Sequence, residues 1–162
     1  MTDHNRQTKL LQLAHQLINH HYKLGTAESC TGGGLSFLLT TLPGSSNWFE
    51  RGLVTYSNEA KMSLLHVKNN TLDQYGAVSK ETAHEMVEGL LTHHPVDVGI
   101  AITGIAGPDG GSVEKPVGTV WIACKTRGAP TQSTLFLFTG DRESIRSQSI
   151  DAAVDQVLLF FK

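Results

Sequence analysis

The stretch VGIAITGIAGPDGG, residues 98–111, decides the fold class that this sequence predicts. Residues 98–103 are almost entirely apolar, as is typical of a central strand that is covered on both faces. The run then enters a glycine-rich loop, where the backbone can approach another group closely. Open α/β sheets bind ligands at the carboxyl ends of their strands, so this loop is a candidate binding segment.

Helices and strands alternate on both sides of this segment. Apolar spacing, capping residues and breakers predict helices at residues 10–18, 35–39, 57–65, 79–93 and 141–161. Strands are predicted at residues 23–27, 52–56, 98–103, 117–125 and 131–138, the last two as an antiparallel pair. This order predicts one domain over residues 1–162, a three-layer α/β/α fold on a mixed, mostly parallel sheet.

The composition restricts the class of partner. Of the 162 residues 40% are apolar and 17% are charged, with a net charge of -2, which argues against disorder and against a polyanion-binding surface. The basic residues are scattered, so we expect no nucleic-acid partner. Two cysteines, a polar N-terminus and no membrane-length apolar run predict a cytoplasmic protein without membrane contact.

Two glycine clusters, at residues 32–34 and 104–111, follow predicted strands. Such clusters expose backbone N–H groups that suit a nucleotide monophosphate or a developing oxyanion, although tight turns alone also explain them. Neither cluster continues into a P-loop, and no GxGxxG motif opens a helix. The histidines lack metal-ligand spacing, so we expect neither a metal nor a cofactor.

A hydrolytic site would need a nucleophile and a base. The hydroxyl or thiol groups beside glycine belong to Ser29, Cys30, Thr31, Ser45 and Ser46, and no histidine lies in a glycine-rich segment. Lys61 is an alternative base if its amine is neutral, and an ordinary solvated helix lysine if it is not. Tyr56 and Thr103, each near a strand end, are candidates to donate to a substrate carbonyl or to make structural hydrogen bonds.

Five motifs in order resemble one family. They are TAESCTGG (26–33), PGSS (43–46), VTYSNEAK (54–61), GAVS (76–79) and TGIAGPDGG (103–111), and the match continues through 114–120 and 140–142. The chain therefore resembles the CinA C-terminal domain family, which includes PncC-type nicotinamide-nucleotide amidases. The larger CinA proteins carry a further N-terminal domain, so this chain is similar to the stand-alone form.

The resemblance implies hydrolysis of nicotinamide mononucleotide to nicotinate mononucleotide and ammonia, a step of pyridine nucleotide salvage, without a metal. Ser46 matches the nucleophile in this interpretation, Lys61 matches the general base, and Tyr56 belongs to the catalytic group. Substrate contacts are expected from Ser29, Thr31, Gly32, Thr103, Gly104, Gly107 and Arg142, the last of them to the phosphate.

Two alternatives stay open. The chain could be a non-catalytic domain that senses a nucleotide or binds a partner, or an amidase for a related pyridine amide. The expected partner is a small nucleotide substrate, and the sequence leaves room for a homo-oligomer.

Overall fold

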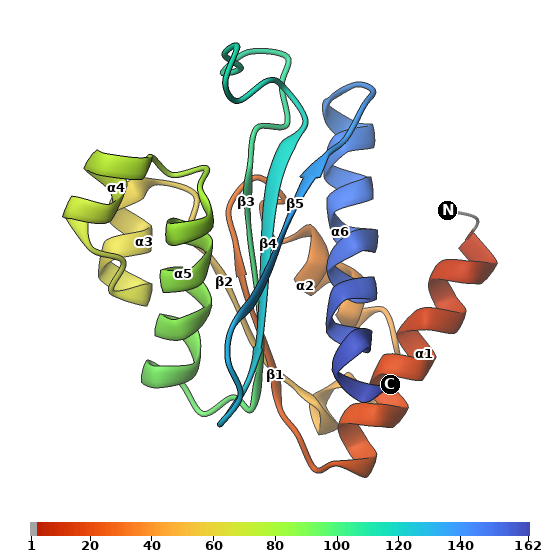
Figure 1. The fold of residues 1–162 in the computed structure, drawn as a ribbon. Helices are drawn as coiled ribbons and strands as arrows, with labels where there is room; N and C mark the ends of the chain where they lie inside the picture. Colours follow the sequence, from red (N-terminus) through yellow and green to blue (C-terminus); the bar gives the residue numbers. More distant parts are fainter. Residues whose placement is uncertain (1–2) are drawn as a thin grey trace.

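The computed structural model describes residues 3–162 and contains a five-stranded sheet in the order β2-β1-β3-β4-β5 (Figure 1). The strands are β1 (Leu24–Glu28), β2 (Phe49–Val54), β3 (Val98–Gly104), β4 (Thr119–Thr126) and β5 (Gln132–Leu137). Strand β1 is parallel to both β2 and β3, whereas β4 is antiparallel to both β3 and β5. The sheet is therefore mixed, with two parallel and two antiparallel pairings.

Helices cover both faces of the sheet, which confirms the predicted three layers (Figure 1). On one face lie α1 (Asp3–Asn19), α2 (Gly34–Thr40) and α6 (Arg142–Leu158), and on the other lie α3 (Asn58–Leu65), α4 (Asn69–Tyr75) and α5 (Lys80–His93). Short 3-10 turns, η1 (Ser45–Asn47) and η2 (Leu159–Phe161), complete the elements. No helix of residues 3–162 is long and apolar enough to cross a membrane.

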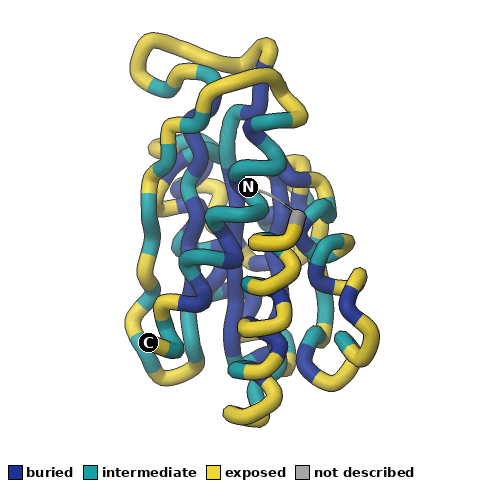
Figure 2. Tube along the Cα trace, turned by 90° about the vertical axis from the view of Figure 1, so that its right-hand side faces the viewer, coloured by how far each residue is buried: buried dark blue, intermediate teal, exposed yellow. Residues whose placement is uncertain are grey.

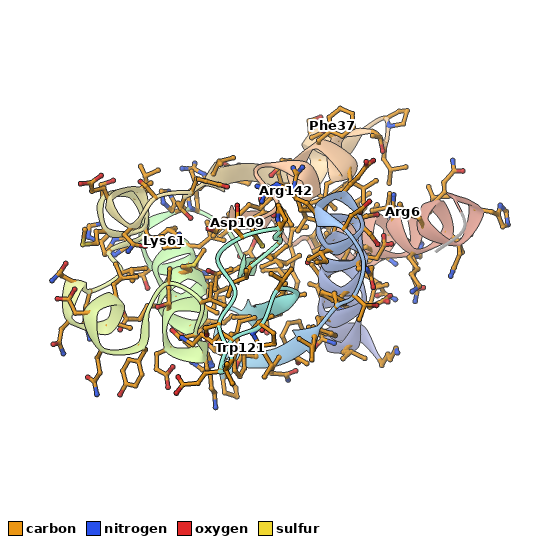
Figure 3. The ribbon with its side chains drawn as sticks, turned by 90° about the horizontal axis from the view of Figure 1, so that it is seen from above. Arg6, Phe37, Lys61, Asp109, Trp121 and Arg142 are labelled. Atoms are coloured by element: carbon orange, nitrogen blue, oxygen red, sulfur yellow. The ribbon has the colours of Figure 1, made fainter. Side chains whose placement is uncertain are left out.

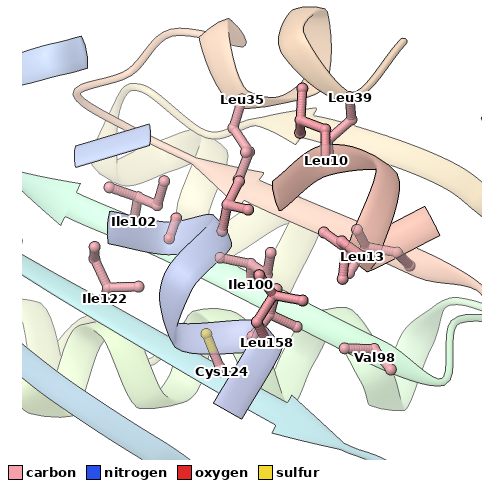
Figure 4. Packing of buried hydrophobic residues seen from close by; sticks show 14 of the residues in the cluster. Leu10, Leu13, Leu35, Leu39, Val98, Ile100, Ile102, Ile122, Cys124 and Leu158 are labelled. Atoms are coloured by element: carbon pink, nitrogen blue, oxygen red, sulfur yellow. The ribbon is translucent and has the colours of Figure 1, made fainter. Parts of the chain in front are cut away.

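The central strand β3 is buried on both faces, as its apolar sequence predicted. Figure 2 shows the buried segments gathered at the centre of the molecule. Val98, Ile100 and Ile102 pack against leucines of α1 and α2 (Figure 4). The other face carries small residues because α5 lies close: a Cβ at Gly99 would stand 2.4 Å from Leu91 Cδ1. Strand β3 therefore fixes the spacing of both helical layers.

The helix α4 was not predicted from the sequence. Its seven residues are too few to show a helical period, and only Thr71 and Leu72 are buried. An acidic side chain of α5 contacts it: Glu85 accepts hydrogen bonds from Thr71 Oγ1 at 2.7 Å and from Lys68 N at 2.8 Å. The position of α4 therefore depends on a long-range contact that the local pattern does not contain.

Candidate active site

A cavity of about 270 Å³ lies where β1, β2 and β3 reach their carboxyl ends. Its wall includes Ser29, which follows β1, and Lys61 of α3, which follows β2. The end of β3 contributes Gly104, and the loop after it contributes Gly107 and Asp109. Parallel strands bring these segments together because they all end at the same edge of the sheet.

Lys61 and Ser29 are in direct contact. The Lys61 Nζ atom lies 3.0 Å from Ser29 Oγ, and it also donates to the main-chain oxygens of Thr55 at 2.9 Å and Tyr56 at 3.2 Å. Lys61 is only 1% exposed, and no carboxylate of residues 3–162 pairs with it. Burial penalises its ammonium form and lowers the pKa of Lys61 to about 8. A large part of this amine is therefore neutral in mildly alkaline solution.

Local structure explains how these two side chains meet. The Ser29 N–H donates to the carbonyl of Ile102 on β3 at 2.9 Å, which fixes the backbone just past β1. Helix α3 begins directly after β2, and the Ser57 hydroxyl caps it by accepting from Ala60 N at 3.0 Å. The first turn of α3 thus brings Lys61 to the segments that directly follow β1 and β2.

The structure does not bring Ser46 to Lys61, and the predicted pairing of these two residues is wrong. Ser46 lies in η1, immediately before β2, whereas Lys61 follows β2. Six strand residues separate the two ends by roughly 20 Å at about 3.3 Å per residue. The Ser46 carbonyl accepts from Lys23 Nζ at 3.2 Å, and Lys23 precedes β1. Ser46 is therefore at the amino end of the sheet, and Ser29 takes its place beside Lys61.

A signal in the sequence favoured Ser29 over Ser46. Both serines lie near glycines, but Ser29 follows a predicted strand and Ser46 precedes one. Ligands in α/β sheets gather at carboxyl ends, so the order of serine and strand separates the two candidates.

Cys30, the other candidate nucleophile, is buried and lines the same cavity. Burial raises the pKa of the Cys30 thiol to about 11. A thiol that stays protonated is a poor nucleophile, so the geometry favours the Ser29 hydroxyl.

The turn after Ser29 is held by Glu28, a residue that the sequence analysis missed. Its carboxylate is completely buried and accepts from Thr31 Oγ1 at 2.8 Å, Leu35 N at 3.0 Å and Ser36 N at 2.8 Å. These bonds cap the start of α2 and fix the turn that carries Ser29. An acidic residue at a strand end usually indicates solvent, so only the structure reveals this role.

Two of the predicted substrate contacts are not part of the cavity wall. Thr31 is buried and its hydroxyl donates to Glu28, while its carbonyl accepts from Arg146 Nη2 at 2.9 Å. Gly32 has a φ of 58°, which the tight turn requires, and it too lies outside the wall of the cavity. Both residues therefore shape the turn in this structure.

Arg142 closes the mouth of the cavity. It donates from Nη1 to the Gly107 carbonyl at 2.7 Å and from Nη2 to the Tyr56 hydroxyl at 3.2 Å. Tyr56 is 59% exposed, so its hydroxyl lies at the rim rather than beside the serine. Thr103 lines the cavity, but its hydroxyl donates to the Ala77 carbonyl at 2.7 Å and so anchors the opposite wall.

Residues 3–162 contain no cluster of three or more histidine, cysteine or acidic side chains that could hold a metal ion. The groups at the cavity include a serine, a buried lysine, backbone N–H groups, an aspartate and an arginine.

The sequence agrees with one family model over residues 6–161, that of the CinA C-terminal domain. The chain belongs to the CinA C-terminal domain family. This CinA-family chain is 52% identical over 123 residues to the nicotinamide-nucleotide amidohydrolase PncC of Enterobacter agglomerans. The matched residues cover 76% of this chain and 75% of that protein. It is 47% identical over 153 residues to PncC of Escherichia coli K12, covering 92% and 90%.

Longer relatives also match. A putative competence-damage inducible protein of Acetivibrio thermocellus is 49% identical over 144 residues, which cover 89% of this chain and 35% of that protein. Among solved structures, a CinA superfamily protein from Escherichia coli superimposes with a TM-score of 0.92 at 36% identity, covering 98% of this chain and 92% of the other. A competence/damage inducible protein from Agrobacterium tumefaciens gives a TM-score of 0.89 at 38% identity, covering 95% and 96%. The α/β fold is therefore that of the CinA superfamily.

Proposed function

We propose that this chain hydrolyses the carboxamide of nicotinamide mononucleotide, giving nicotinate mononucleotide and ammonia for pyridine nucleotide salvage. The observation that carries the proposal is the 3.0 Å contact between Lys61 Nζ and Ser29 Oγ in a cavity at the carboxyl edge of the sheet. Relatives named nicotinamide-nucleotide amidohydrolase, 47% and 52% identical, support the choice of substrate.

The environment of Lys61 suits a general base. A neutral amine has two N–H groups and one lone pair. The main-chain oxygens of Thr55 and Tyr56 take the two N–H groups, so the lone pair is left for the Ser29 hydroxyl. Neutral Lys61 then accepts the serine proton while Oγ attacks the carboxamide carbon.

The remaining steps need no further titrating group. The tetrahedral oxyanion is stabilised by backbone N–H groups of the residues that line the cavity. Lys61 returns the proton to the amide nitrogen, the C–N bond breaks and ammonia departs. The acyl group remains on Ser29 as an ester. Water gives a proton to Lys61, attacks the ester and releases the carboxylic acid, and Lys61 returns the proton to Ser29 Oγ.

The position of Arg142 supports a role in binding the substrate phosphate. Its guanidinium lies at the mouth of the cavity, where it has N–H groups beyond those given to Gly107 and Tyr56. The substrate then lies with its carboxamide at Ser29 and its phosphate at the rim. Binding energy from the distant phosphate orients the reacting amide.

Ammonia release from nicotinamide mononucleotide tests the proposal, with nicotinamide and its riboside as comparison substrates. Ser29→Ala and Lys61→Met should each lower kcat by about 10³-fold or more, because each removes one member of a pair that acts together. Ser46→Ala is the matched control, since Ser46 is another serine near a glycine turn but lies at the far end of β2, and it should keep wild-type activity. Binding of the nucleotide without turnover by the wild type would instead support a sensing domain, and turnover of free nicotinamide alone would support another pyridine amidase.

A further inference from the structure

The cavity wall contains one acidic side chain among the described residues, that of Asp109. No residue of the described chain donates a hydrogen bond to its carboxylate or forms an ion pair with it. A carboxylate repels a phosphate ester, so its presence in this cavity calls for a different part of the ligand. A carboxylate is an acceptor only, and the ligand group that it recognises must therefore be a donor or a cation.

The loop between β3 and β4 places Asp109 between the two ends of the cavity. Two residues before it, the Gly107 carbonyl accepts from Arg142 at 2.7 Å. Beyond Asp109, Lys115 Nζ donates to the Tyr75 carbonyl at 2.8 Å and ties the loop to the end of α4. Seen from above, Asp109 lies between Lys61 and Arg142 (Figure 3). Asp109 thus lines the cavity from a loop that is anchored on both sides of it.

We propose that Asp109 is a specificity-determining residue that accepts hydrogen bonds from the 2′ and 3′ hydroxyls of the substrate ribose. The inference rests on the proposed function, which places the carboxamide at Ser29 and the phosphate at Arg142. The ribose is the part of a pyridine mononucleotide that lies between these two ends. Its two adjacent hydroxyls are donors at the spacing of one carboxylate, the arrangement by which acidic residues bind ribose in dinucleotide sites.

The charge of Asp109 suits the ribose better than the other parts of the ligand. Hydrogen bonds to a charged acceptor are about twice as strong as neutral ones, so a diol gains more from aspartate than from an amide or hydroxyl. Arg142, at the adjacent rim, offsets the repulsion between this carboxylate and the phosphate. The pyridine ring is tied to the carboxamide and therefore lies nearer Ser29 and Lys61 than the loop.

The test compares kcat/KM for nicotinamide mononucleotide and its 2′-deoxy and 3′-deoxy analogues. The wild type should prefer the ribose substrate by about 10-fold to 100-fold, the range of a hydrogen bond to a charged group. Asp109→Ala should lower activity on the ribose substrate by a similar factor and leave the deoxy substrates nearly unchanged. Glu114→Gln is the matched control, because Glu114 is an exposed acid of the same loop outside the cavity wall.

A binding measurement separates this inference from the proposed function. Calorimetry with nicotinate mononucleotide and its 2′-deoxy analogue needs no turnover, and Asp109→Ala should remove the preference for the ribose form. A wild type that turns over the nucleotide but treats ribose and deoxyribose alike would overturn the role of Asp109 alone. Equal losses on all substrates in Asp109→Ala would assign the carboxylate to the ring cation or to the loop, and would also overturn it. A wild type that discriminates the two products in calorimetry without releasing ammonia would support Asp109 and overturn the hydrolysis.

Discussion

Replacing Lys61 with methionine should change the pH dependence of stability in a way that the burial of this amine determines. The pKa of Lys61 falls from the ordinary value of 10.5 to about 8 on folding. Between these values the unfolded chain binds the proton and the folded chain does not, so wild-type stability rises with pH across this window. Below pH 8 the folded protein carries the full penalty, which is about 3 kcal/mol at ~1.4 kcal/mol per pH unit.

Lys61→Met removes this titration. The free energy of unfolding of the variant minus that of the wild type should therefore fall by about 2 kcal/mol between pH 7 and pH 10. The hydrogen bonds lost to the carbonyls of Thr55 and Tyr56 add an offset, but that offset does not titrate and cancels in the comparison. Urea unfolding of both proteins at each pH measures the difference, with exposed Lys80→Met as the control for removing a lysine charge. A Lys61→Met difference that is the same at both pH values would refute the buried, uncompensated amine.

Three further results are expected. The kcat/KM of the wild type should rise with pH to a plateau with a midpoint near 8, because only neutral Lys61 accepts the serine proton. Lys61→Arg should be inactive across the whole pH range. An arginine variant with the wild-type pH profile would show that Lys61 is not the base. Glu28→Gln should lower the free energy of unfolding in urea by about 1–3 kcal/mol, because its amide nitrogen must face an N–H donor of Leu35 or Ser36. In the same variant, kcat should fall by a larger factor than KM rises. An unchanged free energy of unfolding would contradict the capping role. The wild-type kcat/KM should be about 10-fold or more higher for the mononucleotide than for the riboside, and Arg142→Ala should reduce this ratio. A variant with the same ratio as the wild type would place the phosphate elsewhere.

Elements with a local signature could be predicted from the sequence. The apolar run of β3 and the serine-capped helix α5 carry their own evidence, and both form as expected. The late antiparallel pair, β4 and β5, is likewise confirmed. Helix α4 could not be predicted, because its seven residues show no apolar period and its contacts, such as those with Glu85, are long-range.

The candidate site shows the same division between local and long-range information. By residue type Lys61 was a candidate base or an ordinary solvated lysine, and the family resemblance selected the base. The choice between Ser29 and Ser46 depended on which end of the sheet each occupies, and that is a property of topology. The buried state of Glu28 depends on four donors from residues 31–36 that fold around it.

The absence of an acidic partner for Lys61 among the described residues connects the stability of this fold to its chemistry. An aspartate at hydrogen-bonding distance would offset the burial of the ammonium, but it would also raise the lysine pKa and remove the neutral base. Two main-chain carbonyls satisfy the N–H groups without adding a formal negative charge. They are acceptors for either protonation state, so they hold the amine in place while leaving its lone pair available to Ser29. The destabilisation expected below pH 8 is therefore a direct consequence of keeping a base beside the serine.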